Sequence, residues 1–319
     1  MILAGDIGGT NTRLAFFENG QKIVERKYPS RESPNLESIV QQFLQTEKKT
    51  VSRACFGIAG AVRNGRCKAT NLPWILDETA LSRMFHIPVR LLNDLVANAY
   101  GLKMLKKEEF HSLQSGDPEA QGNQALISAG TGLGEACLFW DGKTHHPFAC
   151  EGGHVDFAPR DEEEIDLFQY LRKQFDHVSY ERIVSGPGLH AIFRFLVETG
   201  RYPFSDEAKS EMKKRDPAIV VSDWGGKGKD PACRAALDRF ISLYGAEAGN
   251  VALQFMSLGG LYIGGGIAPH ILEQLKKGPF LSSFLSKGRF RDLLKTIPIW
   301  VILNDDTALI GAAAYAEGL

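Results

Sequence analysis

The sequence predicts an α/β fold that is divided into two domains. Short apolar runs typical of buried strands alternate with segments whose apolar residues recur at helical spacing, as in a sheet covered by helices. A chain of 319 residues is long for a single hydrophobic core, so two domains are expected. A glycine-rich turn between two apolar runs also occurs twice, once in each half. This repetition predicts a duplicated domain in which each half presents one turn to a shared cleft.

Composition and charge argue against several classes of protein. The chain is 44% hydrophobic and 24% charged, and its formal net charge of −1 disfavours a partner made of nucleic acid. No apolar run reaches the length of a membrane span, and the N-terminal residues lack the basic region of a signal peptide. The five cysteines are scattered and odd in number, which is typical of a reducing compartment. We therefore expect a cytoplasmic protein with no membrane partner.

The opening stretch, Ile2–Phe17, predicts two strands joined by a glycine-rich turn. Gly8 and Gly9 lack a Cβ atom, so their N–H groups can come close to an anion. Asp6 stands at the end of the first strand, where its carboxylate could face a hydrated metal ion. A tight hairpin with a solvated aspartate is the alternative interpretation.

Strands and helices are then expected to alternate, and one of the helices has Leu36, Val40 and Phe43 on one face. The expected elements are a strand at 21–28, a helix at 34–47, a strand at 53–59, an edge strand at 65–70, a helix at 78–85, a strand at 89–92 and a helix at 94–105. Asn93 and Asp94 follow the last of these strands, where ligands bind in α/β proteins. Asp94 could accept a proton from an attacking hydroxyl group, or it could merely cap the next helix.

The second half repeats the opening pattern at 124–140, where an apolar strand reaches Gly130-Thr131-Gly132 and a second apolar strand follows. The later chain predicts a helix at 161–175, helical segments at 179–199, a long helix at 231–256, strands at 261–263 and 298–303, and a helix of small residues at 307–316. The polar tract at 201–229 is expected to be an excursion between helices. Its glycine-rich end at 225–229 lacks the spacing of a Walker A loop and is expected to be a solvated turn.

Three further side chains are candidates for binding a polar ligand. Glu151 and His154 flank a flexible pair of glycines, so both can point at one small molecule. Glu181 could reach a ligand hydroxyl from the next helical segment. Each could instead be a solvated surface residue. A zinc site at Cys150 and His154 would need two more ligands, and no cysteine pair is present in the sequence nearby.

Several motifs together resemble the bacterial glucokinases outside the ROK group, within the hexokinase and actin-like ATPase superfamily. They occur in that family's order from end to end, and the run from Glu151 to Pro159 is the most specific of them. The motifs are Gly5–Arg13, Thr70–Trp74, Asn93-Asp94, Ser128–Gly134, Glu151–Phe157, Glu181 with Ser185–Leu189, and Gly264–Pro269. The resemblance implies a two-domain actin-like ATPase (ribonuclease H-like) fold with an interdomain cleft. It also implies a small domain at 1–107 plus 304–319, a large domain at 108–303, and a homodimer.

The same resemblance implies that the protein transfers phosphate from ATP, with Mg²⁺, to the 6-hydroxyl of glucose. Asp94 would be the general base, and Asn93, Asp94, Glu151, His154 and Glu181 would bind the sugar. Two sets of residues would bind ATP, with Gly264 and Gly265 under the adenosine and the phosphates held by Gly5, Asp6, Ile7, Gly8, Gly9, Thr10, Gly130, Thr131 and Gly132. Asp6 would order Mg²⁺ through water, and no side chain is predicted to bind a metal directly.

Three other functions remain possible from the sequence. The chain could be a kinase for another hexose, a sugar-sensing protein without catalysis, or a nucleotide-driven clamp like actin. Sensors on this fold usually carry an added pair of DNA-binding helices, whereas this chain starts directly in the hairpin. The combination of Glu151, His154 and Glu181 is typical of a sugar site and disfavours the clamp.

Overall fold

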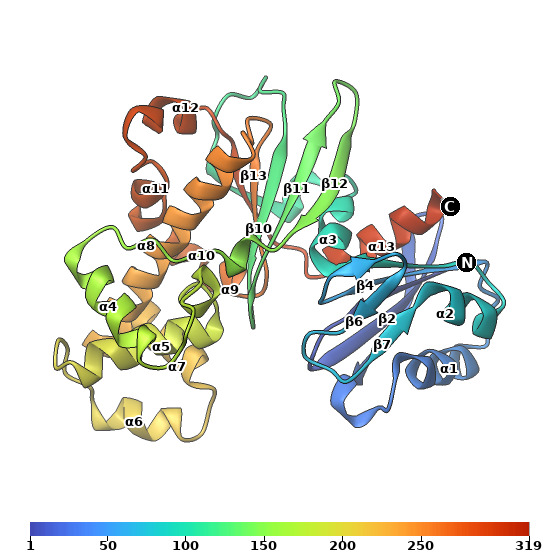
Figure 1. Cartoon of the computed structure of the whole chain (residues 1–319), viewed down its shortest axis with the longest axis horizontal. Coiled ribbons are helices and arrows are strands. Elements are labelled where there is room, and N and C mark those ends of the chain that lie inside the picture. Colours follow the sequence, from blue (N-terminus) through green and yellow to red (C-terminus); the bar gives the residue numbers. More distant parts are fainter. Residues whose placement is uncertain (319) are drawn as a thin grey trace.

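The computed structural model describes residues 1–318, and it confirms an α/β protein built around two main sheets (Figure 1). The first sheet has five strands in the order β3 (Gln21–Pro29), β2 (Asn11–Glu18), β1 (Ile2–Ile7), β4 (Arg53–Ile58) and β8 (Val89–Asn93). The second has six strands in the order β12 (His145–Cys150), β11 (Leu133–Trp140), β10 (Gln124–Ala129), β13 (Leu261–Gly264), β14 (Ile299–Ile302) and β9 (Phe110–Gln114).

The two sheets share one topology. β1 pairs antiparallel with β2 and parallel with β4, and β10 pairs antiparallel with β11 and parallel with β13. The glycine turns therefore join equivalent strands, β1 to β2 and β10 to β11. This agreement supports the duplication that the two turns predict.

Four helices accompany the first sheet, and they are α1 (Leu36–Glu47), α2 (Glu78–Phe85), α3 (Asp94–Leu102) and α13 (Thr307–Glu317). Figure 1 shows α13, near the end of the chain, beside α3 and β4. A Cβ atom at Gly311 of α13 would lie 1.8 Å from the carbonyl oxygen of Ala97, so the two backbones touch. The helix of small residues predicted at 307–316 is confirmed, and its small side chains allow this close contact.

Between β12 and β14 the described chain forms nine helices: α4 (Glu162–Arg172), α5 (Gly186–Glu198), α6 (Asp206–Met212), α7 (Pro217–Lys227), α8 (Pro231–Gln254), α9 (Ile267–His270), α10 (Leu272–Leu275), α11 (Pro279–Phe284) and α12 (Arg291–Lys295). The long helix α8 has 15 of its 24 residues buried, and it contacts α5, α7 and α11. The chain also forms two single helical turns, η3 (Gly152–His154) and η4 (Tyr180–Arg182). Each of them contributes a residue to the cavity described below.

Three local predictions are wrong. The tract at 201–229 contains α6 and most of it is helical, and residues 225–227 are the last turn of α7 rather than a solvated turn. Gly225 is buried there and packs closely on α8, since a Cβ atom at this residue would lie 2.5 Å from the carbonyl oxygen of Cys233. The strand expected at the edge of a sheet, β6 (Arg66–Lys68), is the middle strand of a small third sheet between β5 (Val62–Arg63) and β7 (Ile75–Asp77).

Helix α3 packs against both halves of the molecule. Its residues Leu95, Ala99 and Leu102 form a hydrophobic cluster with Leu126 and Leu138 of the second sheet. Asp94, at its first position, is thereby held between the sheets. The domain boundaries near 107 and 304 stay a prediction. Within residues 1–318, no helix is both long enough and apolar enough to cross a membrane.

Candidate active site

One cavity of about 510 Å³, here called the polar cavity, lies between the two glycine turns. It brings together predicted residues from distant parts of the sequence, and these are Asp6, Gly8, Gly9, Thr10, Asn93, Asp94, Gly130, Thr131, Gly132, Glu151, His154 and Glu181. Gly5 and Ile7 are buried within β1 instead, and neither lines the cavity. Gly264 and Gly265 also do not line it.

Each turn contains three residues and is closed by a backbone hydrogen bond. Gly8 N donates to Asn11 O at 3.0 Å in the first turn, and Gly130 N donates to Gly132 O at 2.8 Å in the second. A Cβ atom at Gly132 would lie 2.5 Å from Oε2 of Glu181, so only glycine fits without moving that carboxylate. The second turn is therefore in direct contact with a predicted sugar-binding residue.

Asn93, rather than Asp94, is the N-cap of α3. Its Oδ1 accepts hydrogen bonds from the backbone N–H groups of Leu95 at 3.0 Å and Val96 at 3.3 Å, while its Nδ2 donates to Gly60 O. The carboxylate of Asp94 accepts a hydrogen bond from Leu95 N at 3.0 Å. Because Asn93 satisfies the helix terminus, the carboxylate of Asp94 is left facing the cavity.

The pKa of Asp94 is raised to about 7, mainly because burial disfavours its charged form and then because the charge of Asp6 lies nearby. The hydrogen bond from Leu95 N opposes this shift. Burial also raises the pKa of Asp6, while the positive charge of Arg13 opposes that shift. A carboxylate whose pKa is close to neutral is well suited to accept a proton from a hydroxyl group.

Glu151, His154 and Glu181 all line the polar cavity, and Glu181 lies beside the second glycine turn. Glu151 precedes η3 and His154 ends it, so both follow β12 at the rim of the sheet. The Nδ1 atom of His154 lies 4.0 Å from Oε1 of Glu181. Leu133 N donates to Oε2 of Glu181 at 3.0 Å, which fixes this carboxylate beside the second glycine turn.

Positive side chains also line the polar cavity. Arg13 ends the first motif, whereas Lys27 and Arg31 were not predicted because they belong to no motif. Arg13 donates to Glu25 at 2.7 Å and also to Asp306, and its pKa is raised above its ordinary value by these two carboxylates despite burial. The cavity therefore combines carboxylates with cations that could face an anionic ligand.

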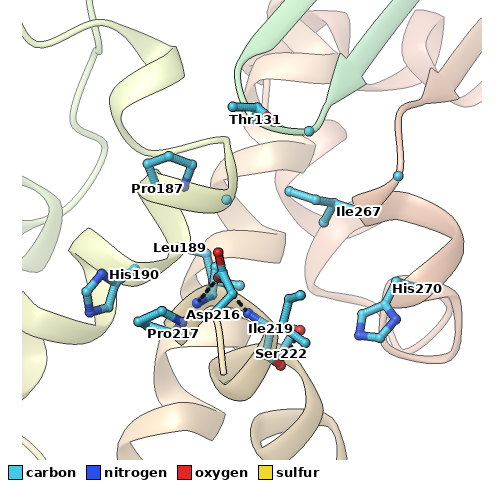
Figure 2. Close-up of a pocket in the computed structure, with 14 residues that line it drawn as sticks. Thr131, Pro187, Leu189, His190, Asp216, Pro217, Ile219, Ser222, Ile267 and His270 are labelled. Atoms are coloured by element: carbon cyan, nitrogen blue, oxygen red, sulfur yellow. Dashed lines mark hydrogen bonds between the residues drawn. The ribbon is translucent and has the colours of Figure 1, made fainter. Parts of the chain in front are cut away.

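A second pocket, of about 600 Å³ and here called the apolar pocket, adjoins the second turn (Figure 2). Gly130 and Thr131 line both the apolar pocket and the polar cavity. Apolar side chains make up most of its wall, and Figure 2 shows Thr131 between Pro187 and Ile267. Polar groups also line it, and these are His190, Asp216, Ser222 and His270.

The sequence did not predict most of the apolar pocket. Its walls come from α5, α7 and α9, which are far apart along the chain and carry no common motif. The nearest signal was the Ser-Gly-Pro-Gly segment, since Gly186 and Pro187 belong to it and line the pocket. Gly266, rather than Gly264 or Gly265, is the member of the glycine triplet that lines it.

A metal centre made of side chains has no geometric support in the described chain. Across residues 1–318, no three His, Cys, Asp or Glu side chains are grouped as ligands of a metal ion. The zinc alternative at Cys150 and His154 therefore gains no further ligand. Cys150 contacts Cys137 instead, and the thiol of Cys137 lowers the pKa of Cys150 to about 7.

Comparison with known proteins gives one family from end to end. The family model described as glucokinase matches residues 3–319. A curated glucokinase from Nostoc punctiforme is 41% identical, and the match covers 100% of this chain and 99% of that protein.

Solved structures give the same result. A glucokinase from an Antarctic psychrotroph superimposes with a TM-score of 0.84 and 29% identity, over 100% of this chain and 99% of the other. A ROK-family glucokinase from Streptomyces griseus, solved with glucose and AMPPNP, has a TM-score of 0.69 at 20% identity and covers 100% and 99% of the two chains. These likenesses confirm the expected actin-like ATPase fold.

Proposed function

The chain belongs to the glucokinase family, a family of enzymes, and on that premise we propose that it phosphorylates glucose at the 6-hydroxyl with ATP. One observation carries the proposal. Asp94, the two glycine turns and the trio of Glu151, His154 and Glu181 all line one polar cavity. A sugar and the end of a triphosphate could therefore meet beside a single ionisable carboxylate.

In the proposed reaction Asp94 is the general base. Its carboxylate takes the proton of the sugar 6-hydroxyl while the hydroxyl oxygen bonds to the γ-phosphorus. The bond from the γ-phosphorus to the bridging oxygen breaks, ADP leaves, and the proton on Asp94 returns to solvent. Phosphoryl transfer depends mainly on positioning and on charge neutralisation, so the position of this base matters more than its strength.

Asn93, Glu151, His154 and Glu181 are proposed to hydrogen-bond the other sugar hydroxyls. A hydroxyl left unpaired in a closed site costs roughly 1–3 kcal/mol. An epimer that mispairs one hydroxyl would therefore bind more weakly. Asn93 Nδ2 already donates to Gly60 O and Glu181 already accepts from Leu133 N, which supports rigid placement of both side chains.

We propose that the adenine and ribose of ATP occupy the apolar pocket and that the phosphates pass along the second turn into the polar cavity. Gly130 and Thr131 line both spaces, which supports this path. Gly5 and Ile7 would act only through the strand that carries the first turn. Gly264 and Gly265 would act by shaping the end of β13, since a Cβ atom at Gly265 would lie 2.2 Å from Ala129 O.

Mg²⁺ is proposed to be held by the phosphates and, through water, by Asp6. A single carboxylate beside phosphate groups fits the preference of Mg²⁺ for few protein ligands and several waters. Asp6 and Asp94 lie close enough for their charges to interact, which is the kind of site a cation would stabilise. When bound, the ion would neutralise charge on the phosphates.

The resemblance to the family is also the basis for proposing a homodimer in the cytoplasm. The five free cysteines support a reducing compartment. Light scattering coupled to gel filtration would test the assembly state, and a single peak at 35.2 kDa would contradict the dimer.

The test of the proposed function is a coupled assay of ADP release with purified protein, a panel of hexoses and a panel of phosphoryl donors. We expect turnover with glucose and ATP. Binding of glucose without turnover would instead favour a sugar sensor. In calorimetry, Glu151→Gln should weaken glucose binding, and an unchanged affinity would remove Glu151 from the sugar site.

A further inference from the structure

Two buried carboxyl groups next to the proposed sugar site are not used by the mechanism above, and one of them, Glu135, is itself among the residues that line the polar cavity. Glu135 in β11 and Glu247 in α8 are each only 1% exposed. With both carboxyl groups ionised, neither oxygen of Glu135 finds a hydrogen-bond donor within residues 1–318, and the side chain within hydrogen-bonding reach is that of Glu247. An unpaired buried carboxylate is strongly unfavourable, so this arrangement requires a physical reason.

Glu135 lies directly beneath the turn that separates Glu151 from His154. It pairs with Cys150 across the β11–β12 hairpin, one residue before Glu151. A Cβ atom at Gly152 would lie 1.8 Å from Oε2 of Glu135, so the carboxyl group touches the backbone of η3. Any displacement of this carboxyl would therefore move the loop that carries Glu151 and His154.

Glu247 reaches the other proposed sugar-binding segment. Its Oε2 accepts a hydrogen bond at 2.8 Å from Nδ2 of Asn250, and Asn250 also donates to the hydroxyl of Tyr180 at 3.0 Å. Tyr180 directly precedes Glu181 in η4. Lys287 donates to Oδ1 of Asn250 from the far side. One turn of α8 is thus connected to η4 through Asn250, and to η3 through the contact of Glu247 with Glu135.

We propose that Glu135 and Glu247 are positioning residues that share one proton and thereby fix η3 and η4 for sugar binding. The inference rests on the proposed function, because it assigns the pair to the same sugar site. With one proton between them, Glu135 is neutral and Glu247 is ionised near Lys287. Without it, two negative charges would face each other in the protein interior and push η3 away.

The electrostatics of the pair agree with this assignment. Burial, and then the charge of Glu247, raise the pKa of Glu135 well above its ordinary value. Burial also raises the pKa of Glu247, but the Asn250 hydrogen bond and the charge of Lys287 oppose that shift, so Glu247 ionises first. The ionisable groups around the two carboxyls are Tyr244, Cys137, Cys150, Tyr180 and Lys287.

The direction in which pH changes sugar affinity follows from these pKa shifts. A group with a raised pKa keeps its proton at neutral pH and loses it as the pH rises, so the pair becomes doubly charged only in alkaline solution. Sugar affinity should therefore weaken there in the wild-type protein. Glu135→Gln keeps the shape of the side chain and cannot lose a proton, so its affinity for glucose should stay constant.

The experiment measures KM and kcat for glucose, and glucose affinity by calorimetry, from neutral to alkaline pH. We expect the wild-type KM for glucose to rise in alkaline solution and Glu135→Gln to abolish the rise. Glu135→Leu should raise KM for glucose about tenfold at neutral pH, while kcat changes less than about threefold. An alkaline rise in Glu135→Gln equal to that of the wild type would overturn the proposal, even if Glu135→Leu fails to fold.

Glu164→Gln is the matched control. Glu164 is also fully buried in the second half of the chain, but it is paired with Arg160 and Arg239. Its substitution should lower the melting temperature without changing the pH dependence of the KM for glucose. If the wild-type protein neither binds nor phosphorylates glucose, the proposed function fails and this inference fails with it. If it does both and Glu135→Gln behaves like wild type, only this inference fails.

Discussion

The two glycine turns occupy equivalent places in their sheets but have different surroundings. The next-to-last residue of β1, before the first turn, is Asp6, whereas the next-to-last residue of β10, before the second, is Ser128. Gly8, Gly9 and Thr10 of the first turn line the polar cavity, while Gly130 and Thr131 of the second turn line both the polar cavity and the apolar pocket. The duplicated topology has therefore diverged in its charge and in its access to the neighbouring pocket.

In the proposed function, this difference gives each half a separate task. The first half brings Asp6 and Asp94 together and supplies the charged groups at which a proton and a phosphoryl group could move. The second half joins an apolar space to a charged one and holds Glu181 through the backbone of Leu133. A ligand with an apolar ring and an anionic tail fits a path across the second turn toward the first.

The largest effect is expected from Asp94→Asn, which removes the proposed base from the first half. Because an amide cannot accept the hydroxyl proton, kcat should fall by at least about 10²-fold. Glucose affinity in calorimetry should change little, since the amide keeps the shape of the side chain. Asp238→Asn, at an exposed ion pair on α8, is the control and should behave like wild type. Near-normal turnover of Asp94→Asn would remove the base from the mechanism.

A smaller and selective effect is expected from Gly266→Leu in the apolar pocket. A Cβ atom at Gly266 meets open space within 4 Å, so the new side chain would fill the pocket without distorting the backbone. The KM for ATP should rise roughly tenfold or more, as expected for loss of about 1.4 kcal/mol or more of binding energy. The KM for glucose should not change. Equal increases in both constants would mean that the pocket does not bind the nucleotide base.

Gly132→Ala should act on the sugar rather than on the nucleotide base. The added methyl group would displace the Glu181 carboxylate and break its hydrogen bond from Leu133 N. Initial rates should show a rise of about threefold to thirtyfold in the KM for glucose. Gly9→Ala, in the first turn, meets Asn71 instead and is expected to leave this constant within about twofold. The same rise in both variants would contradict the division between the turns.

The smallest effect concerns pH. Asp94 must be ionised to act as a base, so kcat/KM should fall as the pH drops through its pKa of about 7. Asp6→Asn removes a neighbouring negative charge, so the pKa of Asp94 and the acid limb of the profile should move to lower pH. Ser128→Ala, at the equivalent place in the second half, should leave the limb where it is. If the acid limb of the kcat/KM profile lies at the same pH in Asp6→Asn as in the wild type, the two carboxylates do not interact.

Local sequence patterns predicted those parts of the site that are formed by short segments. The two turns, Asn93-Asp94 and the loop from Glu151 to His154 could be recognised because each motif is continuous in the chain. The same patterns identified the strands β1 to β4 and β8 of the first sheet and β10, β11, β13 and β14 of the second, but not β9, β12 or the short helices α9 to α12. They left open whether Asp94 caps its helix, and the structure resolves this because Asn93 makes the capping hydrogen bonds.

The remaining parts depend on contacts between distant segments. Ile219 and Ser222 line the apolar pocket from α7, a helix hidden in a tract that is polar and rich in glycine. Lys27 lines the polar cavity only because β3 pairs with β2. In the sequence, Glu135 is one residue of a predicted strand and belongs to none of the motifs. Its burial against Glu247 becomes visible only when α8 is packed on the second sheet.

The most direct test is a crystal structure of the protein with glucose and a non-hydrolysable ATP analogue. We predict the adenine in the apolar pocket, the phosphates along Gly130–Gly132, and the sugar 6-hydroxyl within hydrogen-bond distance of Asp94. A nucleotide bound away from the second turn, or a sugar whose 6-hydroxyl faces away from Asp94, would contradict the proposed mechanism.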